Sequence, residues 1–103
     1  MRSFLISDNH DTLVLLRLAG IDGVVAHGPE ETEKALSSAL AMKDLGILLM
    51  TELAAESIPE KVIKMRSGGS LPLLVEIPDR HGTRRGADFL ARYIREAIGV
   101  KLG

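Results

Sequence analysis

Four short apolar runs recur along the chain, and each is separated from the next by a longer segment with helical spacing. The runs cover residues 4–6, 23–26, 46–50 and 71–77. They read as continuous apolar stretches more than as alternations, so both faces of a sheet built from them are expected to be covered. Strand–helix repeats with right-handed crossovers then predict an α/β fold, in which a small parallel sheet carries helices on both faces.

The first helical segment carries its own start and stop signals. Residues 12–19 are dense in Leu and end before Gly20. Glycine suits the position after a helix because it adopts a positive φ without a steric penalty. Asp11 or Thr12 is expected to cap the start, since each offers a side-chain oxygen to the free N–H groups of the first turn.

Prolines mark the later helices. Pro29, followed by two glutamates, is a favourable opening for a helix because the first helical position needs no N–H donor. The stretch 52–66 has helical spacing, and Pro59 is predicted to restart it as a second piece. These strand–helix steps account for residues 1–79 almost completely.

Composition excludes several classes of protein. The chain has 103 residues, which fits one domain, and it has no cysteine. A disulfide scaffold, a thiolate zinc site and a cysteine nucleophile are therefore excluded. No apolar run approaches the roughly 18 residues that a membrane span needs, and the start reaches a charge too early for a signal peptide. A cytoplasmic location is the expectation.

The net charge of −1 conceals an asymmetry. Residues 1–79 carry 7 basic and 12 acidic side chains, and residues 80–103 carry 6 basic and 2 acidic ones. The net charges of the two parts are therefore −5 and +4. The predicted organisation is a sheet domain over 1–79, followed by a linker and a C-terminal helix over 80–103. An acidic body repels phosphates, and the tail aromatics do not lie among its arginines, so nucleic-acid binding is not expected.

The basic tail has an amphipathic pattern. Apolar side chains from Phe89 to Ile98 follow helical spacing, and arginines lie off this stripe. The stripe either docks as the last covering helix of the sheet or contacts a helix of another protein. The predicted partner-binding residues are Arg85, Phe89, Leu90, Arg92, Tyr93, Ile94, Arg95 and Ile98.

Polar side chains near strand ends are the candidates for chemistry. Asp8, His10 and Asp11 follow the first run and offer ligands that suit Mg²⁺, although a solvated loop whose Asp11 caps a helix is the simpler interpretation. Glu76, close to Asp79, forms a second carboxylate cluster, for which a structural role is expected. No glycine-rich phosphate loop is present, which argues against nucleotide binding. No catalytic, cofactor-binding or metal-binding residue is assigned.

Three segments in register resemble one known family, the F subunits of the V-type (A-type) ATP synthases. The segment 10–21, His-Asp-Thr-Leu-Val-Leu-Leu-Arg-Leu-Ala-Gly-Ile, resembles the family's first loop and helix. Segments 44–52 and 71–78 resemble its third strand and its Pro-x-x-x-Glu-Ile-Pro fourth strand. Leu15-Leu16 replaces a common Gly-Phe pair, which is a core substitution.

The resemblance implies a flavodoxin-like (Rossmann-like) sheet with strand order 2-1-3-4 and a C-terminal helix that can move. It implies a non-catalytic subunit of the rotary central stalk, without a cofactor, in a complex that couples ATP to proton or sodium transport. The implied partners are the coiled-coil D subunit, the socket formed by the C subunit, and the catalytic A/B ring. The implied role of the helix is to modulate ATP hydrolysis, from a position peripheral to the membrane and without insertion into it.

A different class of function stays open on the residues alone. The chain is then a stand-alone α/β regulatory module that binds a metal or a small ligand at the carboxyl ends of its strands. Asp8, His10, Asp11 and Glu76 are the side chains that this alternative uses.

Overall fold

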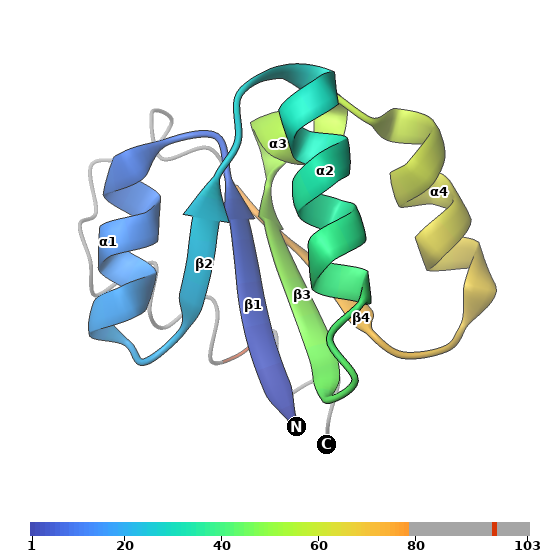
Figure 1. The fold of residues 1–103 in the computed structure, drawn as a ribbon, viewed down its shortest axis with the longest axis horizontal. Coiled ribbons are helices and arrows are strands. Elements are labelled where there is room, and N and C mark those ends of the chain that lie inside the picture. The colour runs from blue at the N-terminus through green and yellow to red at the C-terminus, as the bar shows by residue number, and fades with distance from the viewer. Residues whose placement is uncertain (79–95, 97–103) are drawn as a thin grey trace.

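The structure, a computed structural model, describes residues 1–78 and residue 96. Strands and helices alternate along residues 1–78 (Figure 1), in the order β1 (Arg2–Ser7), α1 (His10–Leu18), β2 (Asp22–Val25), α2 (Gly28–Leu40), β3 (Leu45–Thr51), α3 (Glu52–Glu56), α4 (Pro59–Gly68) and β4 (Leu73–Ile77). The predicted α/β pattern is confirmed. The predicted restart at Pro59 is confirmed as well, because α4 begins there.

The four strands form one parallel sheet in the order β2-β1-β3-β4, as the family resemblance implies. The two central strands carry the most apolar sequences. Every residue of β3 is buried, because β3 has a strand on each side and helices over the sheet. Leu49 of β3 lies beside Leu5 of β1 and Val75 of β4, and all three are buried. This row of side chains crosses the middle of the sheet.

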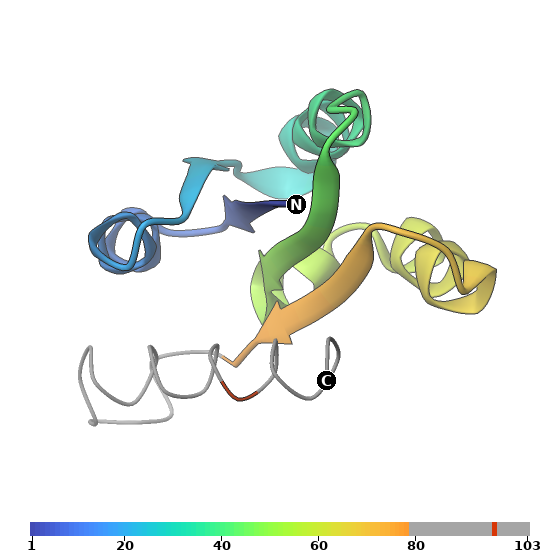
Figure 2. The same cartoon turned by 90° about the horizontal axis from the view of Figure 1, so that it is seen from below.

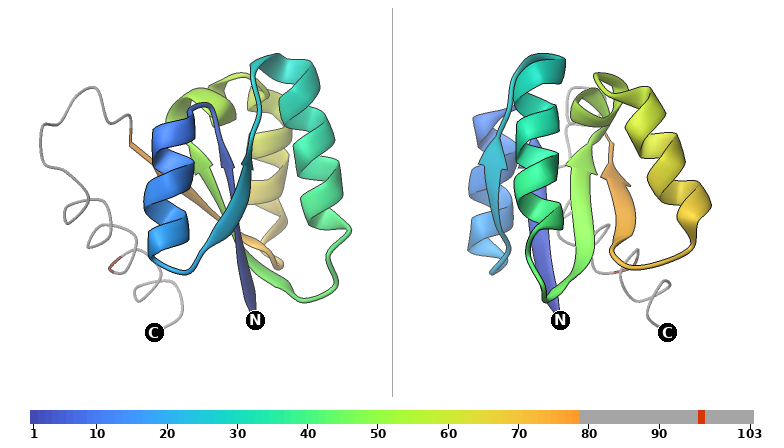
Figure 3. Two further views of the ribbon diagram at one scale, coloured as in Figure 1. Left: turned by 60° about the vertical axis from the view of Figure 1, so that its left-hand side comes forward. Right: turned by 45° about the vertical axis from the view of Figure 1, so that its right-hand side comes forward.

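The core has one part on each face of the sheet. One part joins β-strand residues such as Leu48 and Met50 to buried residues of α2, α3 and α4. The other part joins Leu49 and its neighbours to Leu13 and Leu16 of α1. Figure 2 shows α1 on one side of the twisted sheet and α2 and α4 on the other, and the two views of Figure 3 agree. The predicted covering of both faces is confirmed.

Each strand differs from its predicted run by one or two residues at one end or both. β4 begins at Leu73 and not at residue 71. Pro72 has no N–H to donate to a ladder, which explains why regular pairing starts after it. β2 begins one residue before the predicted run. The predicted helix stop is confirmed, because Gly20 follows α1 with a φ of +87°.

Gly23 of β2 lies against Leu5 of β1 with no room for a side chain. A Cβ added to Gly23 would lie 2.5 Å from the carbonyl oxygen of Leu5 and 2.6 Å from its Cβ. Backbone atoms cannot yield as a flexible side chain does, so Gly23→Ala must push the two strands apart. We expect it to lower the free energy of unfolding by about 2 kcal/mol, the usual size of an overpacking effect.

The matched control is Gly68→Ala in α4, where the nearest atom to an added Cβ is 3.9 Å away. This variant is expected to unfold within about 1 kcal/mol of the wild type, since Ala also restricts the unfolded chain. Urea denaturation followed by circular dichroism measures both. Equal stabilities of the two variants would contradict the close approach of β1 and β2.

Candidate functional site

The loop between β1 and α1 holds the most polar cluster in the sequence, and its side chains bind to the loop itself. Asn9 adopts an extended conformation, and its side-chain oxygen accepts a hydrogen bond of 2.7 Å from the backbone N–H of Thr12. The helix cap is therefore Asn9. The prediction of Asp11 or Thr12 as the cap was wrong by two or three positions, because α1 begins at His10.

Further hydrogen bonds hold this loop in shape. The buried Ser7 hydroxyl donates to the carbonyl oxygen of Asn9 at 2.7 Å and accepts from its N–H at 3.1 Å. The side-chain amide of Asn9 donates to a carboxylate oxygen of Asp8 at 3.1 Å. These bonds satisfy the polar groups where the chain turns from strand to helix.

Thr51 connects this loop to the next strand of the sheet. Its buried hydroxyl oxygen accepts a hydrogen bond of 3.0 Å from the backbone N–H of Asp8, and a longer one of 3.4 Å from that of Ala54. The same side chain thus caps α3 and fixes the β1–α1 loop. Among the described residues, no buried side-chain nitrogen or oxygen lacks a partner.

The structure does not assemble the metal set of the alternative hypothesis. Asp8 and its neighbours follow β1, whereas Glu76 lies in β4, and β3 runs between these two strands. Within residues 1–78 and residue 96, no three His, Asp or Glu side chains come together as a metal site. The described residues therefore give the metal-binding module no support. Asp79, the other carboxylate predicted near Glu76, lies outside them.

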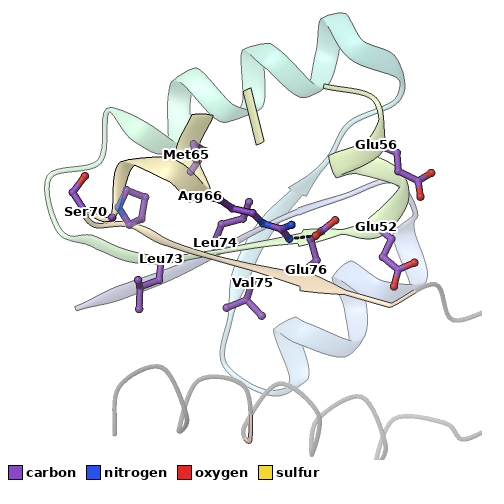
Figure 4. Close-up of a pocket in the computed structure, with 11 residues that line it drawn as sticks. Glu52, Glu56, Met65, Arg66, Ser70, Leu73, Leu74, Val75 and Glu76 are labelled. Carbon is purple, nitrogen blue, oxygen red and sulfur yellow. Dashed lines mark hydrogen bonds and ion pairs between the residues drawn. The ribbon is translucent and has the colours of Figure 1, made fainter. Parts of the chain in front are cut away.

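Glu76 lines a groove along β4, shown in Figure 4. The groove has a volume of about 650 Å³, and one wall of it is α4. Arg66 of α4 forms an ion pair with the carboxylate of Glu76, and Glu52 and Glu56 of α3 lie at one end. The ion pair fits the structural role expected for Glu76. Its contribution to stability is at most about 1 kcal/mol, because the Arg66 side chain is half exposed.

The sequence did not predict that Glu52, Arg66 and Glu76 line one groove. Glu52 begins α3 directly after β3, and β3 pairs with β4, so the sheet places both glutamates along the same groove. The Pro59 restart sets α4 beside β4 and so brings Arg66 to Glu76. No local spacing signals this arrangement, since 23 residues lie between positions 52 and 76.

The predicted partner-binding residues lie outside the described residues. These are Arg85, Phe89, Leu90, Arg92, Tyr93, Ile94, Arg95 and Ile98. Glu96, the described residue of this segment, is helical and exposed. In the described part of the chain, no helix is long and apolar enough to cross a membrane.

Comparison with known proteins gives a consistent result. A family model described as ATP synthase (F/14-kDa) subunit matches residues 4–94. A protein of Pyrococcus furiosus, named as the F subunit of an A-type ATP synthase, is 36% identical over 100 residues, which cover 89% of each chain. Proteins of the same name from Methanocaldococcus jannaschii and Thermococcus kodakarensis are 33% and 32% identical. The alignment with the M. jannaschii protein covers 91% of this chain and 92% of that protein. The alignment with the T. kodakarensis protein covers 89% of each.

Proposed function

Because the chain belongs to the ATP synthase (F/14-kDa) subunit family, we propose that it is a non-catalytic subunit of the rotating central stalk of an A-type ATP synthase. In this role it transmits rotation by contact and makes or breaks no covalent bond. It serves a complex that couples ATP to the transport of protons or sodium ions.

The extent of the family match carries this proposal. The match spans residues 4–94, so it includes β1 from Phe4 onward, the other three strands and the tail stripe as far as Ile94. The relatives that bear the name of this subunit cover about nine-tenths of the chain at 32–36% identity. The proposal therefore rests on body and tail together and not on the sheet alone, which many unrelated proteins share.

The hydrogen bonds made by polar side chains at the carboxyl edge of the sheet support a role in binding other proteins. In proteins of this sheet type, ligands bind at that edge. Here the side-chain oxygen of Asn9 caps α1, and the hydroxyl of Thr51 holds the Asp8 loop. The hydrogen bonds of these groups stabilise the fold. The surfaces of the chain, including the basic tail, are then the parts that bind other proteins.

The proposed partners follow from the position in the stalk. The chain binds the coiled-coil D subunit, and the rotor meets the socket formed by the C subunit and the catalytic A/B ring. The tail, with its net charge of +4 and its apolar stripe, contacts partner helices and modulates ATP hydrolysis. The chain is then peripheral to the membrane and held there by the complex.

Reconstitution tests the regulatory part of the proposal. The A-type ATP synthase of the source organism, stripped of the present chain, receives either the full chain or residues 1–79, and ATP hydrolysis is measured. The full chain is expected to change the rate, whereas the shortened chain, added in excess to offset the weaker binding that loss of the tail stripe causes, leaves the rate unchanged. If both chains bind and give the same rate, the proposed modulation by the tail is wrong.

A further inference from the structure

A second groove lies between α2 and α4, on the face of the sheet opposite α1. Figures 1 and 3 show α2 and α4 as two separate helices that cover the sheet. The groove has a volume of about 370 Å³, and its walls come from the C-terminal half of α2, from α4 and from the turn before β4. It adjoins the Glu76 groove, and Met65, Ser70 and Pro72 line both.

The lining of the groove is largely apolar, and two of its leucines are exposed to solvent. Leu36 and Met65 lie in it, and Leu40 and Leu71 stand at its sides with 46% and 58% of their surfaces exposed. Two exposed leucines therefore line the same groove, and grouped apolar side chains mark contact sites more often than scattered ones do. The surface fits a partner that brings several apolar side chains at once.

The charge of the groove selects among possible occupants. The charged side chains of its described lining are Lys61 and Lys64, one turn apart on α4. The chain's own tail, residues 80–103, has a net charge of +4, so these lysines repel it. A second copy docked symmetrically would set the same lysines against each other, since a two-fold interface pairs each patch with itself. An acidic partner is favoured.

The shape of the groove favours a helix as the occupant. Two helices bound it, and the small residues Ser37, Gly68 and Ser70 lower its walls, so that another backbone can approach. None of the strands is among its described walls, although Leu71 and Pro72 lead into β4. A docked strand would therefore find no edge to pair with, whereas a helix satisfies its own backbone hydrogen bonds.

We propose that the groove between α2 and α4 docks an amphipathic helix, with acidic flanks beside its apolar stripe, from another subunit of the ATP synthase. This inference rests on the proposed function and adds a binding surface that is separate from the tail. Apolar side chains of the partner helix, spaced by three or four residues, fill the space beside Leu40 and Leu71. Carboxylates on the flank of that helix face Lys61 and Lys64.

Charge reversal tests the proposal on exposed side chains, which keeps the fold intact. The variant Lys61→Glu/Lys64→Glu is compared with Lys34→Glu/Lys43→Glu, which changes the net charge equally at exposed lysines outside the groove lining. Binding is measured to the ATP synthase of the source organism from which this chain has been removed. The groove variant is expected to bind at least tenfold more weakly than the wild type, and the control within about threefold, because exposed charges act mainly at short range.

A second pair of variants tests the apolar contact. Leu40→Ser/Leu71→Ser removes both leucines, and Leu18→Ser removes an exposed leucine of α1 on the other face. We expect at least a tenfold loss of affinity for the first variant and no loss for the second, with circular dichroism to show that both are folded.

The outcomes separate this inference from the proposed function. If the wild type binds the stripped complex and the groove variants bind as well as their controls, the groove is not a docking site, while the proposed function stands. If the wild type does not bind at all, both are wrong. If the wild type dimerises and the groove variants are monomers by light scattering, a second copy is the occupant and the inference is overturned.

Discussion

The triple variant Phe89→Ser/Tyr93→Ser/Ile94→Ser is expected to bind the rest of the ATP synthase about a hundredfold more weakly than the wild type. These three side chains are the bulk of the tail stripe. Large aromatic and aliphatic side chains dominate the energetics of interfaces, and one such anchor often accounts for about 2 kcal/mol or more. The loss is measured as the affinity of the purified chain for the complex from which the native copy has been stripped.

The matched control for the tail is Asp88→Ser/Glu96→Ser, which changes two residues of the same segment off the stripe. It is expected to bind as the wild type does. Thermal unfolding of both variants checks that the sheet domain stays folded. If the triple variant assembles and regulates as the wild type does, the tail stripe does not make the partner contact, and the function must lie in the sheet domain alone.

Leu49→Ala is expected to lower the free energy of unfolding by about 3 kcal/mol. Leu49 has no exposed surface and lies in the central strand β3, between Leu5 of β1 and Val75 of β4. Truncation removes buried methyl groups and leaves a cavity in a site that the surrounding sheet holds open, so the cost lies well inside the range of about 2–5 kcal/mol for such changes. The corresponding fall in Tm is about 15 °C for a domain of this size.

Leu18→Ala is the control for Leu49→Ala. Leu18 is the last residue of α1, and 80% of its surface is exposed. Its truncation is expected to change the Tm by no more than about 3 °C, because surface changes usually cost less than about 0.5 kcal/mol. Similar shifts for the two variants would contradict the burial of Leu49 in the middle of the sheet.

Local patterns in the sequence predicted the elements of the fold well. The central strand β3 could be predicted because residues 46–50 are apolar without a break, as a strand covered on both faces must be. The division between α3 and α4 could be predicted from Pro59, since proline is tolerated only in the first turn of a helix. The strand order 2-1-3-4 came from the family resemblance, because no local pattern encodes which strands are neighbours.

Contacts made between distant segments, and the exact position of a cap, could not be predicted. Asn9, and not Asp11, caps α1, because the backbone of Asn9 is extended and held by the Ser7 hydroxyl. The apolar groove combines Leu40 of α2 with Leu71, which follows α4, and their approach depends on how two helices pack on the sheet. The predicted role of the tail residues stays a prediction.

We expect this chain to work as a subunit of an A-type ATP synthase and to perform no chemistry of its own. To test this, the chain is purified from its source organism with a small affinity tag, and the proteins that accompany it are identified by mass spectrometry. We expect recovery of the large A and B subunits and of the D subunit, in a fixed ratio to the tagged chain. Recovery of the chain alone as a monomer, with none of these proteins, would contradict the claim.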